Sequence, residues 1–206
     1  MIKLEFNKYV LDLEPSVYLP SDDTYLLLDV LKQEIGLSSI NNAIEIGSGS
    51  GVISLFLYDY ASKIYAIDIN KDVINSLNKL KEKYKLYNLE IINSDLFTKV
   101  PKDLEFDLIV FNPPYVPTNK EITGKEIAIE DLSTIGGIKG REIIVRFLGQ
   151  LQGFLSEKGV CFLLISSHNE PEFIYNLIKQ LNLDYVICKS ERLFFEQLIV
   201  IKIFKK

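Results

Sequence analysis

Short apolar runs alternate with amphipathic stretches along most of this chain. Seven runs rich in isoleucine, valine, leucine and phenylalanine predict buried strands: residues 43–47, 63–69, 89–94, 106–112, 159–166, 184–189 and 197–204. Five stretches repeat apolar residues at every third or fourth position and predict helices: residues 21–35, 51–60, 71–84, 140–155 and 170–181. Strands and helices that alternate in this way predict an α/β fold, with a mostly parallel sheet covered by helices on both faces.

The length and composition favour one globular domain. A chain of 206 residues is long enough for a single domain with a substantial core. We therefore predict one domain over residues 1–206, with an N-terminal segment and helix over residues 1–40 and the main fold over residues 41–206. No apolar run reaches the roughly 18 to 20 residues of a membrane span, and the N-terminus lacks a signal-peptide pattern. The sequence thus predicts a cytoplasmic protein that does not bind a membrane.

The chain is acidic, with 28 acidic residues, 23 basic residues and a net charge of −5. This balance argues against a protein whose affinity comes from neutralising nucleic-acid phosphates. One basic cluster lies late in the helix predicted over residues 71–84 and comprises Lys79, Lys81, Lys83 and Lys85. Because cations near a helix C-terminus interact favourably with its dipole, we interpret this cluster as a solvated helix face.

The cysteines and the single histidine give no indication of metal binding. Cys161 and Cys188 each lie inside an apolar run, where a buried free thiol is the usual case. His168 follows an apolar run and precedes a predicted helix, which favours a role in a turn or a cap over catalysis. We therefore predict that this chain binds no metal ion.

A glycine-rich turn follows the first predicted strand. Gly47, Gly49 and Gly51 stand between this strand and the next predicted helix. Glycines allow the backbone to turn sharply and to approach a ligand closely, while the start of a helix presents unpaired amides. The motif is also compatible with an ordinary tight loop. Its GxGxG spacing differs from the GxGxxG pattern of dinucleotide-binding proteins, which argues against NAD.

Two aspartates follow the next two predicted strands. Asp68 ends the second strand, where a carboxylate accepts hydrogen bonds from both hydroxyls of a ribose, and Asp95 follows the third strand. Each has a structural alternative, because Asp68 is also placed to cap the next helix and Asp95 to form an Asx-turn. The carboxyl ends of parallel strands meet at one crevice, so both aspartates and the glycine-rich turn are expected to lie together.

The fourth predicted strand ends in the sequence FNPPY. The side-chain oxygen of Asn112 and the carbonyl of Pro113 are two acceptors, and neither Pro113 nor Pro114 has a backbone donor that competes with them. Two acceptors suit a planar amino group, and Tyr115 adds a flat face on which an amide or base lies. The alternative is that the prolines only terminate the strand. The pattern favours a site that holds a substrate amino group.

These segments resemble the S-adenosylmethionine-dependent methyltransferases with a Rossmann-like fold. The resemblance is carried in order by VYLPSDDTYLLLD, EIGSGSG, AIDIN, SDL, FNPPY and GGIKGRE. Among these enzymes, the chain is similar to the HemK-related methyltransferases, which modify the glutamine of the Gly-Gly-Gln motif in class I peptide release factors. The resemblance implies a seven-stranded, mostly parallel sheet and an N-terminal segment that covers the cofactor pocket.

The resemblance also implies roles for individual residues. The cofactor S-adenosylmethionine, and its product S-adenosylhomocysteine, would be bound by Thr24, Glu45, Gly47, Ser48, Gly49, Gly51, Asp68, Ile69, Asp95, Leu96 and Asn112. Among these, the glycine-rich turn and Thr24 would contact the methionine part, Asp68 the ribose and Asp95 the adenine. The catalytic residues, which would hold the substrate amide, are Asn112, Pro113, Pro114 and Tyr115.

A partner protein follows from the same resemblance. The short segment before the first helix is typical of the archaeal and eukaryotic branch of the family, whose members work with a small zinc-binding activator. The predicted strand between Asn88 and Asn93 lies at the sheet edge in the family, and its only charge is Glu90. Because exposed edges pair readily with other chains, we expect the activator to add a strand there, with the metal in the activator.

The chain departs from the family pattern at two places. Leu19 stands where the family usually has glutamate, and the loop between Glu130 and Gly140 lacks a tryptophan that is often present. These departures concern substrate docking rather than the cofactor. Other functions stay open at this point: a nucleic-acid adenine methyltransferase, a protein lysine methyltransferase, or a non-catalytic scaffold that keeps the fold.

Overall fold

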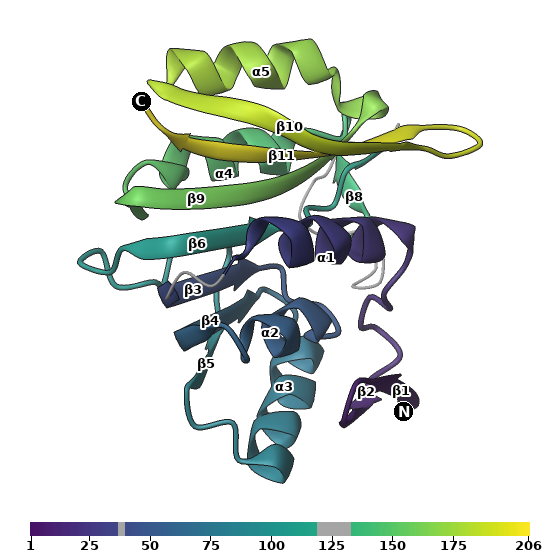
Figure 1. Ribbon diagram of the computed structural model, residues 1–206. Helices are drawn as coiled ribbons and strands as arrows, with labels where there is room; N and C mark the ends of the chain where they lie inside the picture. Colours follow the sequence, from purple (N-terminus) through teal and green to yellow (C-terminus); the bar gives the residue numbers. More distant parts are fainter. Residues whose placement is uncertain (37–39, 119–132) are drawn as a thin grey trace.

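A computed structural model describes residues 1–36, 40–118 and 133–206 of the 206-residue chain (Figure 1). Its centre is a seven-stranded sheet with the strand order β10-β11-β9-β6-β3-β4-β5. The strands are β3 (Ile40–Ile46), β4 (Ala61–Asp68), β5 (Leu89–Asn93), β6 (Phe106–Phe111), β9 (Leu155–Ser166), β10 (Leu183–Arg192) and β11 (Gln197–Lys205). All seven apolar runs therefore form strands of one sheet, as the sequence predicted.

The sheet is mostly parallel. β3 pairs in parallel with both β4 and β6, β4 pairs with β5, and β6 pairs with β9, whereas β11 runs antiparallel between β9 and β10. Within this sheet, the chain begins at β3, builds outward to β5 and then returns to β6 on the other side of β3. Strand order thus reverses at β3, and a crevice is expected beyond the carboxyl ends of β3, β4 and β6.

Helices cover both faces of the sheet because each carries one apolar stripe. α1 (Asp22–Glu34), α2 (Val52–Leu57) and α3 (Lys71–Tyr84) pack on one face, and α4 (Glu142–Leu151) and α5 (Pro171–Gln180) pack on the other. The alternating side chains of the strands divide between these two cores; for example, Ala43 faces the first and Ile44 the second. The predicted bounds of α3 are confirmed, whereas α2 is shorter than predicted. Ser21 holds the N-cap position of α1, but its side chain makes no capping hydrogen bond.

An N-terminal hairpin was not predicted. β1 (Ile2–Phe6) and β2 (Tyr9–Leu13) pair antiparallel across a two-residue turn that contains Asn7 with a φ of 52°. Alternating apolar residues around an asparagine turn are the sequence signal for such a hairpin. The hairpin packs on α3. Lys83 Nζ lies 3.4 Å from Asp12 Oδ2, and Lys79 Nζ lies 3.3 Å from Glu14 Oε1 just after the hairpin. The lysine cluster is therefore only partly a solvated face, since two of its members bind the N-terminal segment.

Three short elements complete the described chain. β7 (Val116–Pro117) and β8 (Ile135–Gly137) form a small parallel pair, and a 3-10 turn, η2 (Ser167–Asn169), follows β9. His168 lies in that turn, where its backbone N–H donates to Ser166 Oγ, so the predicted turn role is confirmed. Cys161 is buried and Cys188 half-buried, and both are free thiols. None of the helices in the described ranges is long and apolar enough to cross a membrane.

Candidate active site

A cavity of about 520 Å³ lies at the carboxyl ends of β3, β4 and β6. We call it the crevice; the N-terminal segment, the small β7–β8 pair and α4 complete its walls. The predicted site residues that line it are Thr24, Glu45, Gly47, Ser48, Gly49, Asp68, Ile69, Asp95, Leu96, Asn112, Pro113, Pro114 and Tyr115. Gly51 is the predicted residue that does not. The topology therefore brings together nearly every residue that the sequence singled out.

The glycine-rich turn depends on backbone conformations that other residues rarely adopt. Gly47, Gly49 and Gly51 have φ values of 66°, 48° and 83°, in the left-handed region where a Cβ is unfavourable. A Cβ on Gly51 would also lie 2.4 Å from Leu77 Cδ2. Gly51 thus allows α2 to pack closely on α3, whereas Gly47 and Gly49 bring bare backbone to the crevice wall.

Glu45 is buried at the base of the crevice. Its Oε2 accepts hydrogen bonds from the Ser54 backbone N–H (2.8 Å) and from the Ser54 hydroxyl. Burial raises the pKa of Glu45 to about 8, although the bonds from Ser54 oppose the shift. The side chain is therefore largely protonated near neutral pH, and a cation bound beside it would favour the ionised form.

Asp68 is fixed by backbone amides. Its two oxygens accept from Gly49 N–H (3.0 Å) and Asn70 N–H (2.8 Å), and burial raises its pKa. The alternative of a helix cap is wrong, because Asn70 caps α3 by accepting from Asp72 N–H at 2.9 Å. Each carboxylate oxygen retains a second lone pair, so Asp68 is oriented and still has acceptor capacity for a ligand in the crevice.

Asp95 has a partner that the sequence did not indicate. Arg146, from α4, donates to Asp95 Oδ2 at 2.6 Å, and both residues line the crevice. The pair is about half exposed, so its net contribution to stability is small. Its effect is positional, because Arg146 holds the carboxylate at the edge of the crevice. Leu96, beside it, has a φ of 48° and is buried.

Asn112 carries a buried polar atom without a partner. Within the described residues, Asn112 Oδ1 is shielded from water and accepts no hydrogen bond, and Asn112 is one of the residues that line the crevice. An unpaired buried acceptor costs roughly 1–3 kcal/mol, so native proteins rarely keep one without a reason. A ligand donor in the crevice would satisfy it. This is the property expected of an acceptor for a substrate amino group.

Tyr115 is oriented by an aspartate that the sequence analysis missed. Asp23, buried in the first turn of α1, accepts from Tyr18 Oη at 2.9 Å and from Tyr115 Oη at 3.4 Å. Burial, followed by the charge of Asp23, raises the pKa of Tyr115 far above its usual range. Tyr115 is therefore a neutral hydroxyl group that donates to Asp23. The signal for Asp23 was weak, since acidic residues are common in the first turn of any helix.

Asn169 fixes the backbone around Tyr115. This fully buried residue of η2 donates through Nδ2 to the carbonyls of Tyr115 and Gly140, each at 2.8 Å, and accepts from Ser166 N–H at 2.7 Å. A Cβ on Gly140 would lie 2.3 Å from the Tyr115 carbonyl. Asn169 and Gly140 thus clamp the strand end that carries Asn112. Of the predicted docking loop, Gly140 is described, while Glu130 lies outside the described residues.

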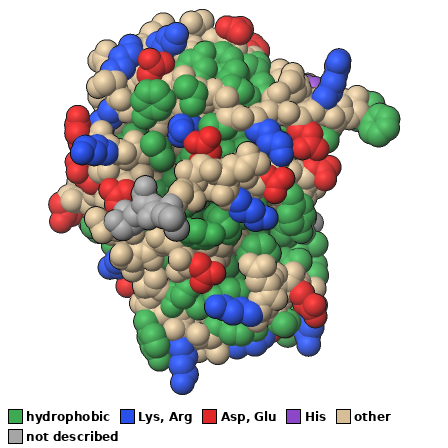
Figure 2. Space-filling model, viewed as in Figure 1, with side chains coloured by type: hydrophobic (Ala, Val, Ile, Leu, Met, Phe, Trp, Pro, Cys, Tyr) green, Lys and Arg blue, Asp and Glu red, His purple; other side chains and the backbone are tan. Residues whose placement is uncertain are grey.

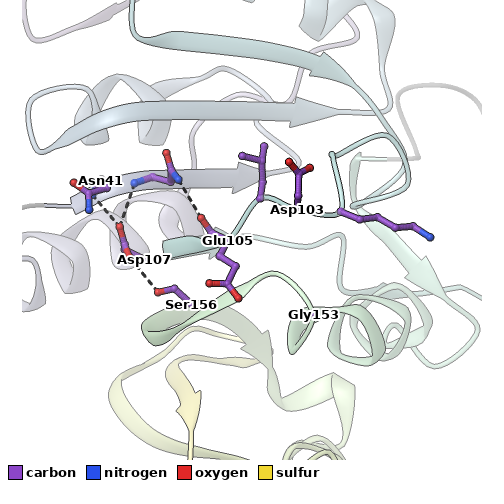
Figure 3. A pocket seen from close by; sticks show the side chains of 9 residues that line it. Asn41, Asp103, Glu105, Asp107, Gly153 and Ser156 are labelled. Carbon is purple, nitrogen blue, oxygen red and sulfur yellow. Dashed lines mark hydrogen bonds between the residues drawn. The ribbon is translucent and has the colours of Figure 1, made fainter.

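A second cavity, of about 440 Å³, lies at the opposite, amino ends of β3, β6 and β9; we call it the hollow. Asp107 points into its wall and accepts from the backbone N–H groups of Asn41 (2.9 Å) and Asn42 (3.2 Å) and from Ser156 Oγ (3.0 Å), as Figure 3 shows. Asn42 Nδ2 also donates to the Glu105 carbonyl. Asp107 is thus satisfied by groups that join three strand starts, which explains the hollow as a structural junction.

Comparison with known proteins shows the family of this chain. The family model described as the methyltransferase small domain matches residues 21–130. A Methanocaldococcus jannaschii protein named as a candidate protein N5-glutamine methyltransferase is 35% identical over 96% of both chains, and methyltransferase HEMK2 of Homo sapiens is 34% identical over 92% of this chain and 90% of its own. This chain belongs to the HemK-related methyltransferases.

Solved structures show where this HemK-related methyltransferase stands among its fold relatives. The E. cuniculi Mtq2–Trm112 complex, described as responsible for methylation of the termination factor eRF1, aligns with a TM-score of 0.69 and 26% identity over 93% of this chain and 99% of that one. A T. thermophilus 16S rRNA methyltransferase in complex with AdoMet and guanosine aligns with a TM-score of 0.74 and 19% identity over all of this chain and 50% of that one. The second likeness establishes only the shared class I methyltransferase fold.

Proposed function

We propose that this enzyme transfers a methyl group from S-adenosylmethionine to the side-chain amide nitrogen of the glutamine in the Gly-Gly-Gln motif of a class I release factor. The observation that carries the proposal is the unpaired, buried Oδ1 of Asn112 at the crevice, beside Pro113 and Tyr115. A glutamine amide offers two N–H donors on a planar group. Relatives named for glutamine methylation, from an archaeon and from bacteria, support the choice of substrate.

The crevice fits S-adenosylmethionine. In this proposal, Asp68 accepts from the ribose hydroxyls through the lone pairs that Gly49 and Asn70 leave free. Asp95 binds the adenine amino group on the side not occupied by Arg146. Gly47, Gly49 and Ser48 line the methionine part together with Thr24, and ionised Glu45 stabilises its ammonium group. Ile69 and Leu96 pack on the flat adenine, because both line the crevice between the two aspartates.

The chain contributes alignment more than acid–base chemistry. When bound, the cofactor supplies a methyl group on a sulfonium that is an excellent leaving group. Asn112 Oδ1 and the Pro113 carbonyl accept the two amide protons and point the nitrogen at that methyl group. S-adenosylmethionine held by the crevice residues would supply the methyl group, S-adenosylhomocysteine would leave with the electron pair of the broken sulfur–carbon bond, and the methylated nitrogen would give one proton to solvent. The two acceptors stabilise positive charge on nitrogen during transfer. Pro114 has no backbone N–H that would compete with the substrate for these acceptors, and the Tyr115 ring restricts the orientation of the substrate amide.

The free edge of the sheet supports a second protein in the complex. β5 ends the strand order, pairs only with β4 among the described strands, and presents half-buried Ile91 and Ile92. Because the related Mtq2 was solved with Trm112, we propose a small zinc-binding activator that adds a strand along residues 88–93. Hydrogen exchange of this chain with and without such an activator tests the edge. New protection should centre on residues 89–92, and protection confined to the crevice would contradict this assignment.

Methyl transfer from labelled S-adenosylmethionine tests the function directly. The activator-bound enzyme should label a class I release factor, should fail to label the same factor with its motif glutamine replaced by alanine, and should leave oligonucleotides unlabelled. Mass spectrometry should place one methyl group on the glutamine amide. Labelling of an adenine-containing oligonucleotide, or of lysine in the release factor, would instead assign the crevice to one of the alternative substrates.

A further inference from the structure

The hairpin between β10 and β11 ends in two exposed aromatic residues. Phe194 is 100% exposed and Phe195 is 92% exposed, and their ring centroids lie 6.4 Å apart. The turn itself is closed by Leu193 N–H donating to the Glu196 carbonyl at 2.8 Å, so the rings are not needed to form it. Such turns usually carry glycine, asparagine or aspartate. The hairpin projects beyond the sheet in Figure 1, and Figure 2 shows hydrophobic atoms at this projecting end.

The base of this tip is anchored to the clamp of the active site. Glu196 Oε2 accepts from Ser166 Oγ at 2.5 Å, and Gln197 N–H donates to Ser167 Oγ at 3.0 Å. Ser166 and Ser167 adjoin Asn169, whose side chain holds the Tyr115 carbonyl. The tip is therefore connected through Ser166 and Asn169 to the segment that follows Asn112. The two phenylalanines are presented on a fixed support at the crevice side of the sheet.

Three residues in or next to the crevice segments are also apolar and exposed. Leu19 is 39% exposed, Val116 43% and Ile138 54%. Leu19 and Val116 follow the crevice residues Tyr18 and Tyr115, and Ile138 follows Gly137, whose carbonyl accepts from Thr118 N–H at 3.0 Å. Exposed apolar residues beside a ligand crevice are typical of a surface that another protein covers.

We infer that the Phe194–Phe195 tip docks on an apolar surface of the protein substrate, next to the loop that carries the methylated glutamine. The inference rests on the proposed function, in which a side chain of a folded protein enters the crevice. Two phenylalanines bury about 150–250 Å² each, far less than the roughly 1,200 Å² of a stable interface. That area suits an auxiliary contact beside the crevice rather than a dimer of this chain. The activator, proposed at β5, lies at the opposite edge of the sheet from β10 and β11.

Methylation kinetics with two substrates test this inference. The activator-bound enzyme is compared on an intact release factor and on a short peptide that contains the Gly-Gly-Gln motif, which is too small to reach the tip. Phe194→Ser with Phe195→Ser should raise KM for the intact factor about tenfold or more, because each ring loses its burial. The kcat, the peptide kinetics and the melting temperature should stay unchanged. Replacement of both phenylalanines by leucine should bring KM for the intact factor most of the way back to the parental value. Ile187→Ser, at an exposed position of the same hairpin, is the matched control and should leave KM unchanged.

The outcomes separate this inference from the proposed function. If the parental enzyme methylates both substrates and the double serine variant keeps the parental KM for the intact factor, the docking role of the tip is wrong while the function stands. If the parental enzyme methylates neither substrate, both fail. A photo-crosslinking residue at position 194 gives an independent readout. An adduct with the release factor supports the inference, whereas adducts only with the activator or with a second copy of this chain overturn it.

Discussion

The two ends of the central sheet carry cavities of similar volume and opposite character. The crevice at the carboxyl ends has about 520 Å³ and the hollow at the amino ends about 440 Å³, and aspartates of the sheet line both. In the hollow, Asp107 accepts from three donors of its own chain. In the crevice, Asn112 Oδ1 is buried without a partner among the described residues. The difference lies in whether the fold itself satisfies the polar groups.

This difference supports the crevice as the proposed site of chemistry. A polar group that is already satisfied contributes to stability and has little left to offer a ligand, whereas an unpaired buried acceptor is a cost that binding removes. The parallel topology gathers the ligand-facing residues at one end of the sheet, because the glycine-rich turn and the polar residues stand at the carboxyl ends of β3, β4 and β6. Substitutions at matched positions of the two cavities should therefore have opposite consequences.

The largest effect is expected for Asn112→Ala. Loss of one acceptor leaves an amide proton of the substrate unpaired in the crevice, at a cost of about 1–3 kcal/mol, so methyl transfer should fall roughly tenfold to a hundredfold. Binding of S-adenosylmethionine should change little. Single-turnover transfer to the release factor measures the effect, and Asn42→Ala in the hollow is the control. A parental rate for Asn112→Ala would remove this residue from catalysis.

The next effect concerns the cofactor. Asp68→Ala should weaken binding of S-adenosylmethionine about tenfold or more, because it removes the acceptors for the ribose and the anchor of Gly49 N–H. Asp68→Asn keeps one acceptor oxygen and should lose less. Isothermal titration of the three proteins gives the affinities. Equal affinities for the parental protein and Asp68→Ala would place the ribose elsewhere.

The next prediction concerns how the free energy of unfolding depends on pH because of the buried Glu45. The pKa of Glu45 is raised from 4.5 to about 8 in the folded protein, so the fold favours the protonated form. Its contribution to stability is complete below about pH 4.5 and is lost as pH rises through about 8. Glu45→Gln should therefore be more stable than the parental protein at pH 8, by roughly 3–5 kcal/mol, and similar at pH 4. Denaturant unfolding at both pH values measures these free energies, and Glu105→Gln at the hollow is the control. The prediction would be wrong if the stability of Glu45→Gln and of the parental protein changed with pH in parallel.

The smallest effect on activity is expected in the hollow. Asp107→Ala removes three hydrogen bonds to Asn41, Asn42 and Ser156 and should lower the free energy of unfolding by about 1–2 kcal/mol. Methyl transfer and cofactor affinity should stay at parental values at a temperature where the variant is folded. If Asp107→Ala lowered transfer as strongly as Asn112→Ala, the contrast between the two cavities would fail.

Much of the fold was predictable because its signals are local. The apolar runs marked all seven strands of the main sheet, and the stripe of Val73, Leu77 and Leu80 marked α3 within its bounds. The N-terminal hairpin was missed although its pattern is also local, because two short strands bury little surface on their own. It is stabilised by tertiary contacts, because Tyr9, Leu11 and Leu13 are buried in the core and Tyr84 and Lys83 of α3 bind its backbone and Asp12.

For the site, the sequence by itself determined which residues end the strands: glycines, aspartates and the FNPPY segment, whose conformational limits act within a few residues. Tertiary structure decided which partners they have. Asp23 and Tyr115 are 92 residues apart, Asn169 and Tyr115 are 54 apart, and Arg146 and Asp95 are 51 apart. No local pattern encodes such hydrogen bonds, because each depends on where the fold places a helix or turn against a distant strand end. For the same reason, the sequence could not show that Asp107 is satisfied and Asn112 is not.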